Sequence, residues 1–338
     1  MLKFYLWSVL ICVVLSFAGQ AADAAVRVEL KGSTMGTRYA VTYVDGDDAQ
    51  RAAIHSEIAA LFVEIDNELS NWNSQSWVSR FNRNESLDTM AVPAHAAAVL
   101  QVALQVAAQS DGALDPTIAP LVELWGFGAS KEWVGPPLPF EIEQALERCG
   151  YTELDFDAAQ RLLRKQVPEL QLNLSAVAKG YAVDQVAAVL AGQGIEDYLI
   201  NIGGEVRASG LRPDGRAWAV RITLPVMETT EAGSYIALHN ASIATSGFSQ
   251  RFFVWKGQRY AHLIDPRSGQ PVSNGLRSVS VRAEDCAVAD GWATACCVLG
   301  LEAGMALIES LNDVDAVFYL ENEAGEFVER VSSGWLGQ

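Results

Sequence analysis

The sequence predicts an α+β fold with mostly antiparallel sheets and packed helices. Short β-type runs and amphipathic helical segments come in clusters along the chain rather than in strict alternation, which favours antiparallel strands. Of the 338 residues, 50% are hydrophobic, so the chain can bury a large core without disulfides. We expect one functional domain over residues 25–338, built from two interleaved subdomains.

The first residues predict a secretory signal peptide over residues 1–24. Lys3 precedes an apolar run from residue 4 to residue 18, and the small-residue site Ala22-Asp23-Ala24 follows. This is the order of a signal peptide and its cleavage site. An uncleaved membrane anchor is the alternative, although the apolar run is short for a membrane span. We therefore expect an exported, periplasmic protein whose mature chain begins near Ala25.

Three segments of the amino-terminal half have the three-and-four spacing of amphipathic helices. They follow the strand-like run "VRVELKG" and cover residues 51–69, the stretch after Pro93 that stops at Asp111-Gly112, and residues 139–149. Gly150 follows the third segment, as glycine commonly does just past a helix end.

The remainder of the chain contains clusters of β-type runs and three further helical segments. The runs "ELDF", "RLLRK" and "LQLNL" predict strands, a helix follows from residue 176 to about residue 190, and "DYLINI" predicts a strand that ends at Gly203-Gly204. "AWAVRI" and "YIALH" come next, and "RFFVWKGQRYAHLI" predicts a hairpin that turns at Lys256-Gly257. Helices over "CAVADGWATACCVLG" and "AGMALIESL" and strands over "DAVFYL" and "EFVERV" close the chain.

The net charge of −17 argues against a nucleic-acid-binding protein, which would need clustered lysine and arginine. If so acidic a chain binds a phosphorylated ligand, then a helix amino terminus, a lysine or a divalent cation must offset the repulsion.

The cysteines indicate packing rather than metal chemistry. Cys149, Cys286, Cys296 and Cys297 remain after residue 24, and none of their spacings is CxxC. Three of them lie in or beside one apolar helix, where free cysteine behaves as a small hydrophobic residue. A disulfide at Cys286 stays open as an alternative.

Asp290 and Thr294 are the strongest candidates for a cation site. They lie four positions apart, so they share one face of an otherwise apolar helix, and burying a carboxylate without a partner is costly. Two oxygens from one helix suit Mg²⁺, which takes few protein ligands and completes its shell with water and phosphate oxygens. Zinc would need His or Cys ligands in suitable spacing.

A lysine near a helix start is the second candidate. In "LNLSAVAKGYAVD", Ser175 is expected to cap a helix whose first turn carries Lys179, an arrangement that suits an anion. Gly180 costs about 1 kcal/mol in a helix relative to alanine. It therefore suggests that a ligand or a backbone approaches closely.

Other polar positions have both a structural and a functional interpretation. Asp115 precedes a proline, where an Asx turn competes with ligand binding. His262 follows apolar strand residues and is either a core histidine or a general base. Trp72 and Trp77 are candidates for stacking on a ring system, although tryptophan more often packs in a core.

In order along the chain, "GSTMGTRY", "LSNWNSQSWVSRFN", "DGALDPT", "LSAVAKGYAVD", "HLIDPRSGQP" and "VADGWATA" resemble the successive motifs of the ApbE family of FAD:protein FMN transferases. The resemblance covers essentially the whole mature chain. It implies an exported, Mg²⁺-dependent enzyme that transfers the FMN part of FAD to a Thr or Ser hydroxyl of another protein and releases AMP. The expected acceptor is an exported or membrane-bound redox protein.

The resemblance also implies roles for individual residues. FAD contacts are expected at Met35, Trp72, Ala113, Leu114, Asp115, Asn173, Lys179 and Ile264. Metal ligands are expected from the side chains of Asp290 and Thr294 and the carbonyls of Ala176 and Ala287. Catalytic roles fall to Asp290 and to His262 as the base. The family commonly has Asp where this chain has Asn173, which keeps an acceptor and loses a charge.

Two other functions fit the same residues. Water in place of the acceptor hydroxyl would make the protein an FAD pyrophosphatase that yields FMN and AMP. A periplasmic flavin-binding protein without turnover would need the same flavin contacts but no catalytic base.

Overall fold

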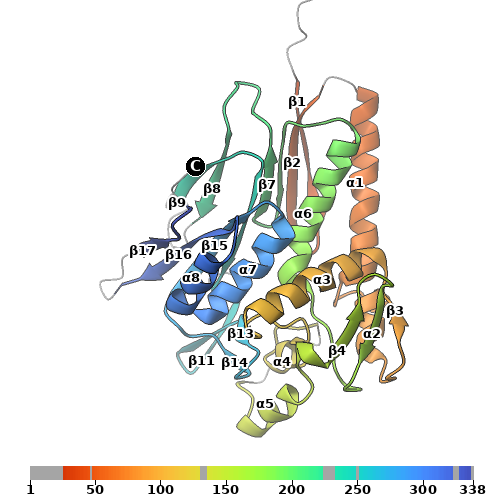
Figure 1. The fold of residues 1–338 in the computed structure, drawn as a ribbon, viewed down its shortest axis with the longest axis vertical. Coiled ribbons are helices and arrows are strands. Elements are labelled where there is room, and N and C mark those ends of the chain that lie inside the picture. The colour runs from red at the N-terminus through yellow and green to blue at the C-terminus, as the bar shows by residue number, and fades with distance from the viewer. Residues whose placement is uncertain are drawn as a thin grey trace, which may run out of the picture.

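Eight antiparallel strands form the main sheet, in the order β1-β2-β6-β7-β10-β15-β16-β17 (Figure 1). The computed structural model describes residues 26–45, 48–129, 135–223, 233–248, 251–322 and 327–335. The strands are β1 (Val26–Thr34), β2 (Thr37–Asp45), β6 (Tyr198–Ile202), β7 (Glu205–Ser209), β10 (Ala241–Gly247), β15 (Leu276–Ala283), β16 (Asp315–Glu321) and β17 (Phe327–Val331).

Helices cover one face of this sheet, and a hairpin packs against the other. The helices are α1 (Asp48–Leu69), α2 (Trp77–Arg83), α3 (Ala94–Gln109), α4 (Ala119–Leu124), α5 (Pro139–Leu146), α6 (Ser175–Gly192), α7 (Cys286–Leu299) and α8 (Leu301–Ser310). In Figure 1, α6, α7 and α8 lie across the sheet, and their apolar residues join those of α1 and α3 in the largest core cluster. The hairpin of β8 (Trp218–Thr223) and β9 (Gly233–Leu238) forms a second cluster with Val206, Ile243 and Tyr319 of the sheet.

A third apolar cluster joins α4 and α5 to a separate hairpin, β11 (Phe252–Trp255) and β12 (Gln258–Ala261). The ring of Trp125 stacks on Tyr260 with centroids 5.6 Å apart, and Phe127 stacks on Phe253 at 4.6 Å. The short strands β13 (Ile264–Asp265) and β14 (Gln270–Pro271) follow, and β3 (Met90–Ala91), β5 (Leu162–Lys165) and β4 (Leu154–Asp157) form a small sheet. These additions extend the molecule beyond the main sheet and help to enclose the cavity described below.

Helices α6 and α7 make the closest approach that bears on the site. A Cβ atom at Gly180 would lie 2.2 Å from the carbonyl oxygen of Cys286, so only glycine fits there. The Asp184 carboxylate accepts hydrogen bonds from the amides of Cys286 and Ala287 at 3.0 and 2.9 Å. Helix α6 thus caps the amino terminus of α7, and the close approach suggested by the sequence is to backbone.

The α+β prediction is confirmed, the expected turn at Lys256-Gly257 forms, and a second tight turn lies at Met35-Gly36. Met35 and Gly36 connect β1 to β2 with φ of 49° and 72°, and Lys256 and Gly257 connect β11 to β12 with φ of 48° and 81°. Positive φ at both central residues suits a two-residue hairpin. The segment "GSTMGTRY" is therefore a hairpin turn rather than an open loop.

Several predictions on element bounds need correction. The segment "LQLNL" is not a strand, because it makes only one isolated bridge in the described residues, between Gln171 and Ile118. The Asn82 side chain accepts a hydrogen bond from the amide of Leu172 and donates one to its carbonyl. The helix that begins at residue 139 ends at Leu146 rather than Cys149. Strands β2, β7, β10 and β15 were not predicted.

The cysteines in the described residues are free thiols, so the structure does not contain a disulfide at Cys286. Cys286, Cys296 and Cys297 are buried, as their position on an apolar helix indicates. None of the helices in the described ranges has the length and apolar character needed to cross a bilayer. The predicted signal peptide, residues 1–24, lies outside the described residues.

Replacing Gly180 by alanine should destabilise the fold, because the new methyl group would press on the backbone of α7. We expect Gly180→Ala to lower the free energy of unfolding by about 1–3 kcal/mol, as measured by urea denaturation. Gly192→Ala on the same helix is the matched control, since no atom lies within 4 Å of its added Cβ. The control should be neutral or stabilising by up to about 1 kcal/mol, and equal effects of the two variants would contradict the steric argument.

Candidate functional site

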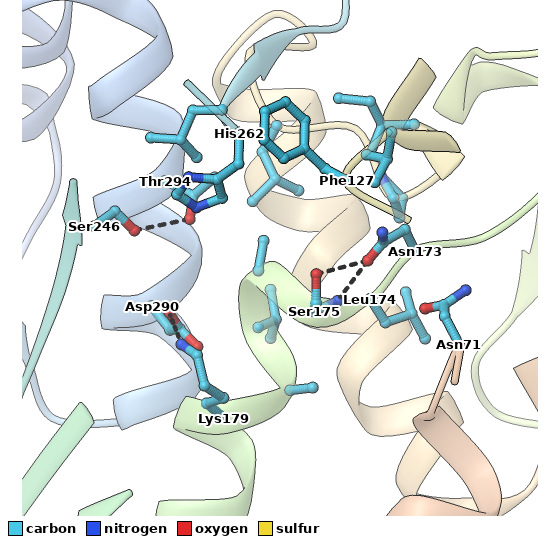
Figure 2. A pocket seen from close by; sticks show the side chains of 18 of the residues that line it. Asn71, Phe127, Asn173, Leu174, Ser175, Lys179, Ser246, His262, Asp290 and Thr294 are labelled. Carbon is cyan, nitrogen blue, oxygen red and sulfur yellow. Dashed lines mark hydrogen bonds and ion pairs between the residues drawn. The ribbon is translucent and has the colours of Figure 1, made fainter. Parts of the chain in front are cut away.

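A cavity of about 790 Å³ lies between the helices α1, α4, α6 and α7, the ends of the strands β7, β10 and β15, and Arg251 and His262, which flank the β11–β12 hairpin. Its size suits a nucleotide-sized ligand. Figure 2 shows side chains from different elements pointing toward one space, with Asp290 and Thr294 on one side and Asn71 and Asn173 on the other.

Helix α7 supplies the two oxygens predicted from the sequence. Asp290 is 2% exposed, and its Oδ2 accepts a hydrogen bond of 3.0 Å from the amide of Gly180. One turn later, the Thr294 hydroxyl hydrogen-bonds the Ser246 hydroxyl of β10 at 3.0 Å. Both side chains line the cavity and are held by neighbouring elements (Figure 2).

Lys179 of α6 lies between two buried carboxylates. Its Nζ is 2.7 Å from Oε1 of Glu205 and 3.5 Å from Oδ1 of Asp290. The other oxygen of Glu205, Oε2, is buried and has no hydrogen-bond partner. The cluster therefore holds two carboxylates against one ammonium group.

The charged groups in this cluster shift one another's pKa values. Burial raises the pKa of Asp290 to about 7, with Glu205 adding to the rise and Lys179 opposing it. Burial alone would lower the pKa of Lys179, but Asp290 and Glu205 hold it well above its ordinary value. Lys179 is therefore a permanent positive charge, and further positive charge at Asp290 would favour its ionised form.

These residues fit a hard divalent cation. The described residues contain no group of three or more His, Cys, Asp and Glu side chains placed to hold a metal. A cation at Asp290 and Thr294 would therefore depend on one carboxylate, one hydroxyl and backbone carbonyls, as Mg²⁺ accepts and zinc does not. The unpartnered Oε2 of Glu205 marks the local excess of negative charge that such a cation would offset.

The two predicted backbone ligands lie in different positions relative to the cavity. The carbonyl of Ala176 belongs to a residue that lines the cavity, whereas Ala287 is not among the lining residues. Ala287 lies in the first turn of α7, where its amide is engaged by Asp184. Its contribution to a cation site stays a prediction that rests on the resemblance alone.

Lys179 and Ser175 also sit differently from expectation. Helix α6 begins at Ser175, so Lys179 lies in its second turn rather than its first. The N-cap residue is Leu174 rather than Ser175, and no side chain caps the helix. Just before it, Oδ1 of Asn173 accepts from the amide and the hydroxyl of Ser175 at 3.1 and 2.6 Å. Asn173 lines the cavity, but its carbonyl oxygen is already engaged in this local structure.

His262 lies just after β12 and lines the cavity beside Phe127 (Figure 2). Its Nδ1 is 3.1 Å from the carbonyl oxygen of Arg251, which only accepts, so Nδ1 carries the hydrogen. This leaves Nε2 as the unprotonated nitrogen. Burial, together with the charges of Arg251 and Lys179, lowers the pKa of His262 to about 4 although the bond to the Arg251 carbonyl raises it. The ring is therefore neutral near pH 7 and suited to accept a proton.

The remaining predicted ligand contacts surround the same cavity. Met35 enters from the β1–β2 turn, and Trp72, 57% exposed, lies at the rim. Buried positions on the wall are Ala113, Leu114, Asp115 and Ile264. Trp77 does not reach the cavity: it is 5% exposed, and its Nε1 donates to the carbonyl of Ala91.

The Asp115 side chain has a structural role, because both of its oxygens accept hydrogen bonds from neighbouring residues. One carboxylate oxygen accepts from the amide and hydroxyl of Thr117 at 2.7 and 2.6 Å, and the other accepts from the Tyr151 amide at 3.0 Å. This is the Asx turn that the following proline suggests. Burial raises the pKa of this carboxyl.

Glu205 is the site residue that the sequence analysis missed. It is the first residue of β7, directly after the Gly203-Gly204 turn, which was noted only as a strand end. An acidic residue that starts a buried strand is a signal for a charged partner. The partner, Lys179, lies on a helix earlier in the sequence, so the pairing itself was not visible.

Comparison with known proteins gives consistent results. Residues 35–318 match the model of the ApbE family. The FAD:protein FMN transferases of Vibrio cholerae and Haemophilus influenzae are 36% and 34% identical to this chain; the alignments cover 97% and 96% of this chain and 97% and 95% of theirs.

Solved structures agree with the sequence matches. The flavin transferase ApbE from Vibrio cholerae superposes with a TM-score of 0.84 at 36% identity, over 92% of this chain and 98% of that one. The apo form of the flavinyl transferase ApbE from Pseudomonas stutzeri gives a TM-score of 0.83 at 35% identity, over 92% and 96% of the two chains.

The His262 ring should stay neutral as the pH falls well below its ordinary range. We expect nitrogen-detected NMR to show the Nδ1–H form from pH 7 to pH 5 and a titration midpoint of about 4. An unfolded histidine takes up a proton near pH 6.5. The contribution of His262 to the free energy of unfolding should therefore fall as the pH drops from about 6.5 to about 4.

The His262→Gln variant assigns the resonance in this experiment. Arg251→Gln should raise the midpoint, because it removes the positive charge but keeps the backbone carbonyl, whereas Arg251→Lys should leave the midpoint nearly unchanged. A wild-type midpoint at or above the ordinary histidine value would contradict the electrostatic account of the ring.

Proposed function

The chain belongs to the ApbE family, and from this membership we propose that it transfers FMN from FAD to a Thr or Ser hydroxyl of an exported acceptor protein. Mg²⁺ would be the cofactor and AMP the second product. The observation that carries the proposal is the convergence of Asp290, Thr294, Lys179 and His262 on one cavity. Relatives that share most of the chain are named FAD:protein FMN transferase.

The proposed reaction exchanges one phosphorus–oxygen bond for another. The acceptor hydroxyl oxygen attacks the phosphorus of the FMN half of FAD, and the bond from that phosphorus to the bridging oxygen breaks. AMP leaves with the bridging oxygen, and FMN remains on the acceptor as a phosphoester. The hydroxyl proton passes to a base and finally to solvent or to AMP.

In this proposal, the positive charge that the reaction needs comes from Lys179 together with a divalent cation. FAD brings about two negative charges on its diphosphate, and the acidic chain must offset them locally. Lys179 is fixed by Glu205 and Asp290, so it presents its charge to the cavity without reorganisation. A divalent cation held by Asp290 and Thr294, when bound, would neutralise phosphate charge and stabilise the leaving AMP.

His262 is suited to accept the proton of the incoming hydroxyl. Its unprotonated Nε2 is set by the bond from Nδ1–H to the Arg251 carbonyl. Its depressed pKa keeps it neutral at pH 7, although a base this weak contributes through position more than through basicity. Phe127, with ring centroids 6.2 Å away, limits the movement of the imidazole.

The proposed location and partner follow from the predicted signal peptide. An enzyme exported to the periplasm would meet acceptor domains that are exported or anchored in the membrane. We propose that these acceptors are redox proteins, since covalent FMN is useful to a protein that carries electrons.

The function is tested by incubating the mature protein with FAD, Mg²⁺ and candidate acceptor domains, with in-gel flavin fluorescence and mass as readouts. A fluorescent acceptor with the added mass of FMN supports transfer, and AMP should appear in equal amount. Free FMN without labelled acceptor would indicate the pyrophosphatase. Bound FAD that persists with Mg²⁺ present and releases no AMP would indicate a flavin-binding protein.

Asp290→Asn should abolish Mg²⁺-dependent transfer while leaving the fold intact. The amide preserves the size of the side chain and an acceptor for the Gly180 amide, but it loses the charge that a cation needs. We expect transfer to fall by about 100-fold or more and the thermal midpoint to stay close to that of the wild type. Asp285→Asn, at the start of the same helix with a side chain 62% exposed, should keep full activity. Full activity in Asp290→Asn would refute the cation assignment.

His262→Ala should slow the chemical step far more than it weakens FAD binding. We expect kcat to fall by about 100- to 10,000-fold, with the FAD dissociation constant, measured by flavin fluorescence, within about threefold of the wild-type value. Equal losses in kcat and in FAD affinity would instead indicate that His262 serves the structure of the cavity wall.

A further inference from the structure

The base of the β11–β12 hairpin borders the cavity, and the hairpin connects directly to the proposed catalytic base. Arg251 immediately precedes β11 and His262 immediately follows β12, and both line the cavity. The amide of His262 donates to the carbonyl of Arg251 at 3.1 Å, which closes the base of the hairpin. A molecule bound along the hairpin is therefore led toward His262.

The two faces of the hairpin differ. Phe253 and Tyr260 pair across the strands and stack on Phe127 and Trp125, so this face is anchored to the α4 region. Val254 on the opposite face is 60% exposed, and Phe252 on the same face is 37% exposed. This leaves exposed apolar surface on the face opposite Phe253 and Tyr260, although Ala261 on that face is buried.

The outer face is also positively charged. Arg259 is paired across the strands with Val254, and its guanidinium lies 3.7 Å from the centroid of the Phe252 ring. Lys256 is exposed at the turn, and its Nζ lies 6.0 Å from the centroid of the Trp255 ring, so it adds positive charge at the tip of the hairpin. In the described part of the chain no carboxylate lies within ion-pair distance of Arg251, Lys256 or Arg259.

This charge contrasts with the rest of the molecule. No acidic residue occurs between Glu231 and Asp265, in a chain whose net charge is −17. A negatively charged partner is therefore repelled by most of the surface and attracted to this hairpin, which orients the encounter. The hairpin is a sheet of only two strands, so an extended segment can also pair with a strand edge.

We propose that the outer face of the β11–β12 hairpin is the docking surface for the acceptor protein. The occupant is an extended acceptor segment in which acidic side chains and at least one apolar side chain flank the hydroxyl residue. The acidic side chains meet Lys256 and Arg259, the apolar one packs on Phe252 and Val254, and the hydroxyl reaches the cavity beside His262. This inference rests on the proposed function.

The test compares hairpin variants with matched variants elsewhere, using the acceptor domain that becomes labelled in the transfer assay. The charge variant is Lys256→Glu with Arg259→Gln, where glutamine keeps a donor for the Phe248 carbonyl that Arg259 contacts. Its control is Arg216→Glu with Arg212→Gln, in the β7–β8 connection, which lies at the other end of the molecule from β11 in Figure 1. The apolar variant is Val254→Ser, with Val63→Ser on α1 as its control, because both valines are 60% exposed.

We expect the charge variant to raise the KM for the acceptor about tenfold or more, with kcat at saturating acceptor and FAD affinity nearly unchanged. The wild-type KM should rise with salt concentration, and that of the variant should rise much less. Val254→Ser should raise the KM by about threefold to tenfold. Both controls should match the wild type. Lys256→Glu alone, at the exposed turn, should show a smaller rise in KM and keeps the test valid if the double variant misfolds.

Several results would contradict the proposal that the acceptor docks on this surface. An unchanged KM for the acceptor in the hairpin variants, with transfer intact, would exclude docking there while leaving the proposed function standing. Sedimentation showing that wild-type protein self-associates and the charge variant does not would assign the face to a second copy of the chain. Binding of the wild type, but not the charge variant, to vesicles containing anionic phospholipid, with an unchanged KM, would assign it to a membrane. Failure of the wild type to label any acceptor would instead remove the proposed function and, with it, this surface.

Discussion

The site depends on one partly buried ammonium group. Without Lys179, the carboxylates of Asp290 and Glu205 would be buried close together with no positive charge between them, at a cost of several kcal/mol. The lysine comes from α6, the aspartate from α7 and the glutamate from β7, so this one contact ties three elements together. Gly180, the next residue, permits the helices to approach closely enough for the contact and donates its amide to Asp290.

This arrangement explains why the cavity is formed by segments distant in sequence. The main sheet and α6–α7 provide a rigid wall with the charged groups, whereas the third apolar cluster holds the opposite rim through the stacked rings of Trp125, Phe127, Phe253 and Tyr260. The part of the cavity wall that contains Asp115 and Asn173 is held by local hydrogen bonds of these two side chains. The charged groups are thus concentrated on one side of the cavity, and the opposite side determines the shape of the cavity.

Much of the site was predictable from the sequence because its signals are local. The four-residue spacing of Asp290 and Thr294 determines that they share a helix face, and glycines at required positive φ marked the hairpin turns. Strands β10 and β15 were missed because their serine and threonine residues do not resemble an apolar strand, although several are buried by packing under α7. "LQLNL" had the opposite property: it alternates like a strand, but the side chain of Asn82 replaces a neighbouring strand. The role of Glu205 could not be predicted from the sequence, because it depends on a contact with Lys179 of α6, which is distant in the sequence.

The buried thiols of α7 have a consequence for how the protein must be made. Burial holds the pKa of Cys296 at about 12 and that of Cys286 well above its ordinary value, so in the native state these thiols are protonated and inaccessible. The unfolded chain has no such protection. In an oxidising compartment its cysteines are open to incorrect pairing, and Cys286 and Cys297 lie on the same helix as the proposed cation ligands. If the chain is exported, as we propose, then α7 must pack before its thiols are oxidised for the site to form.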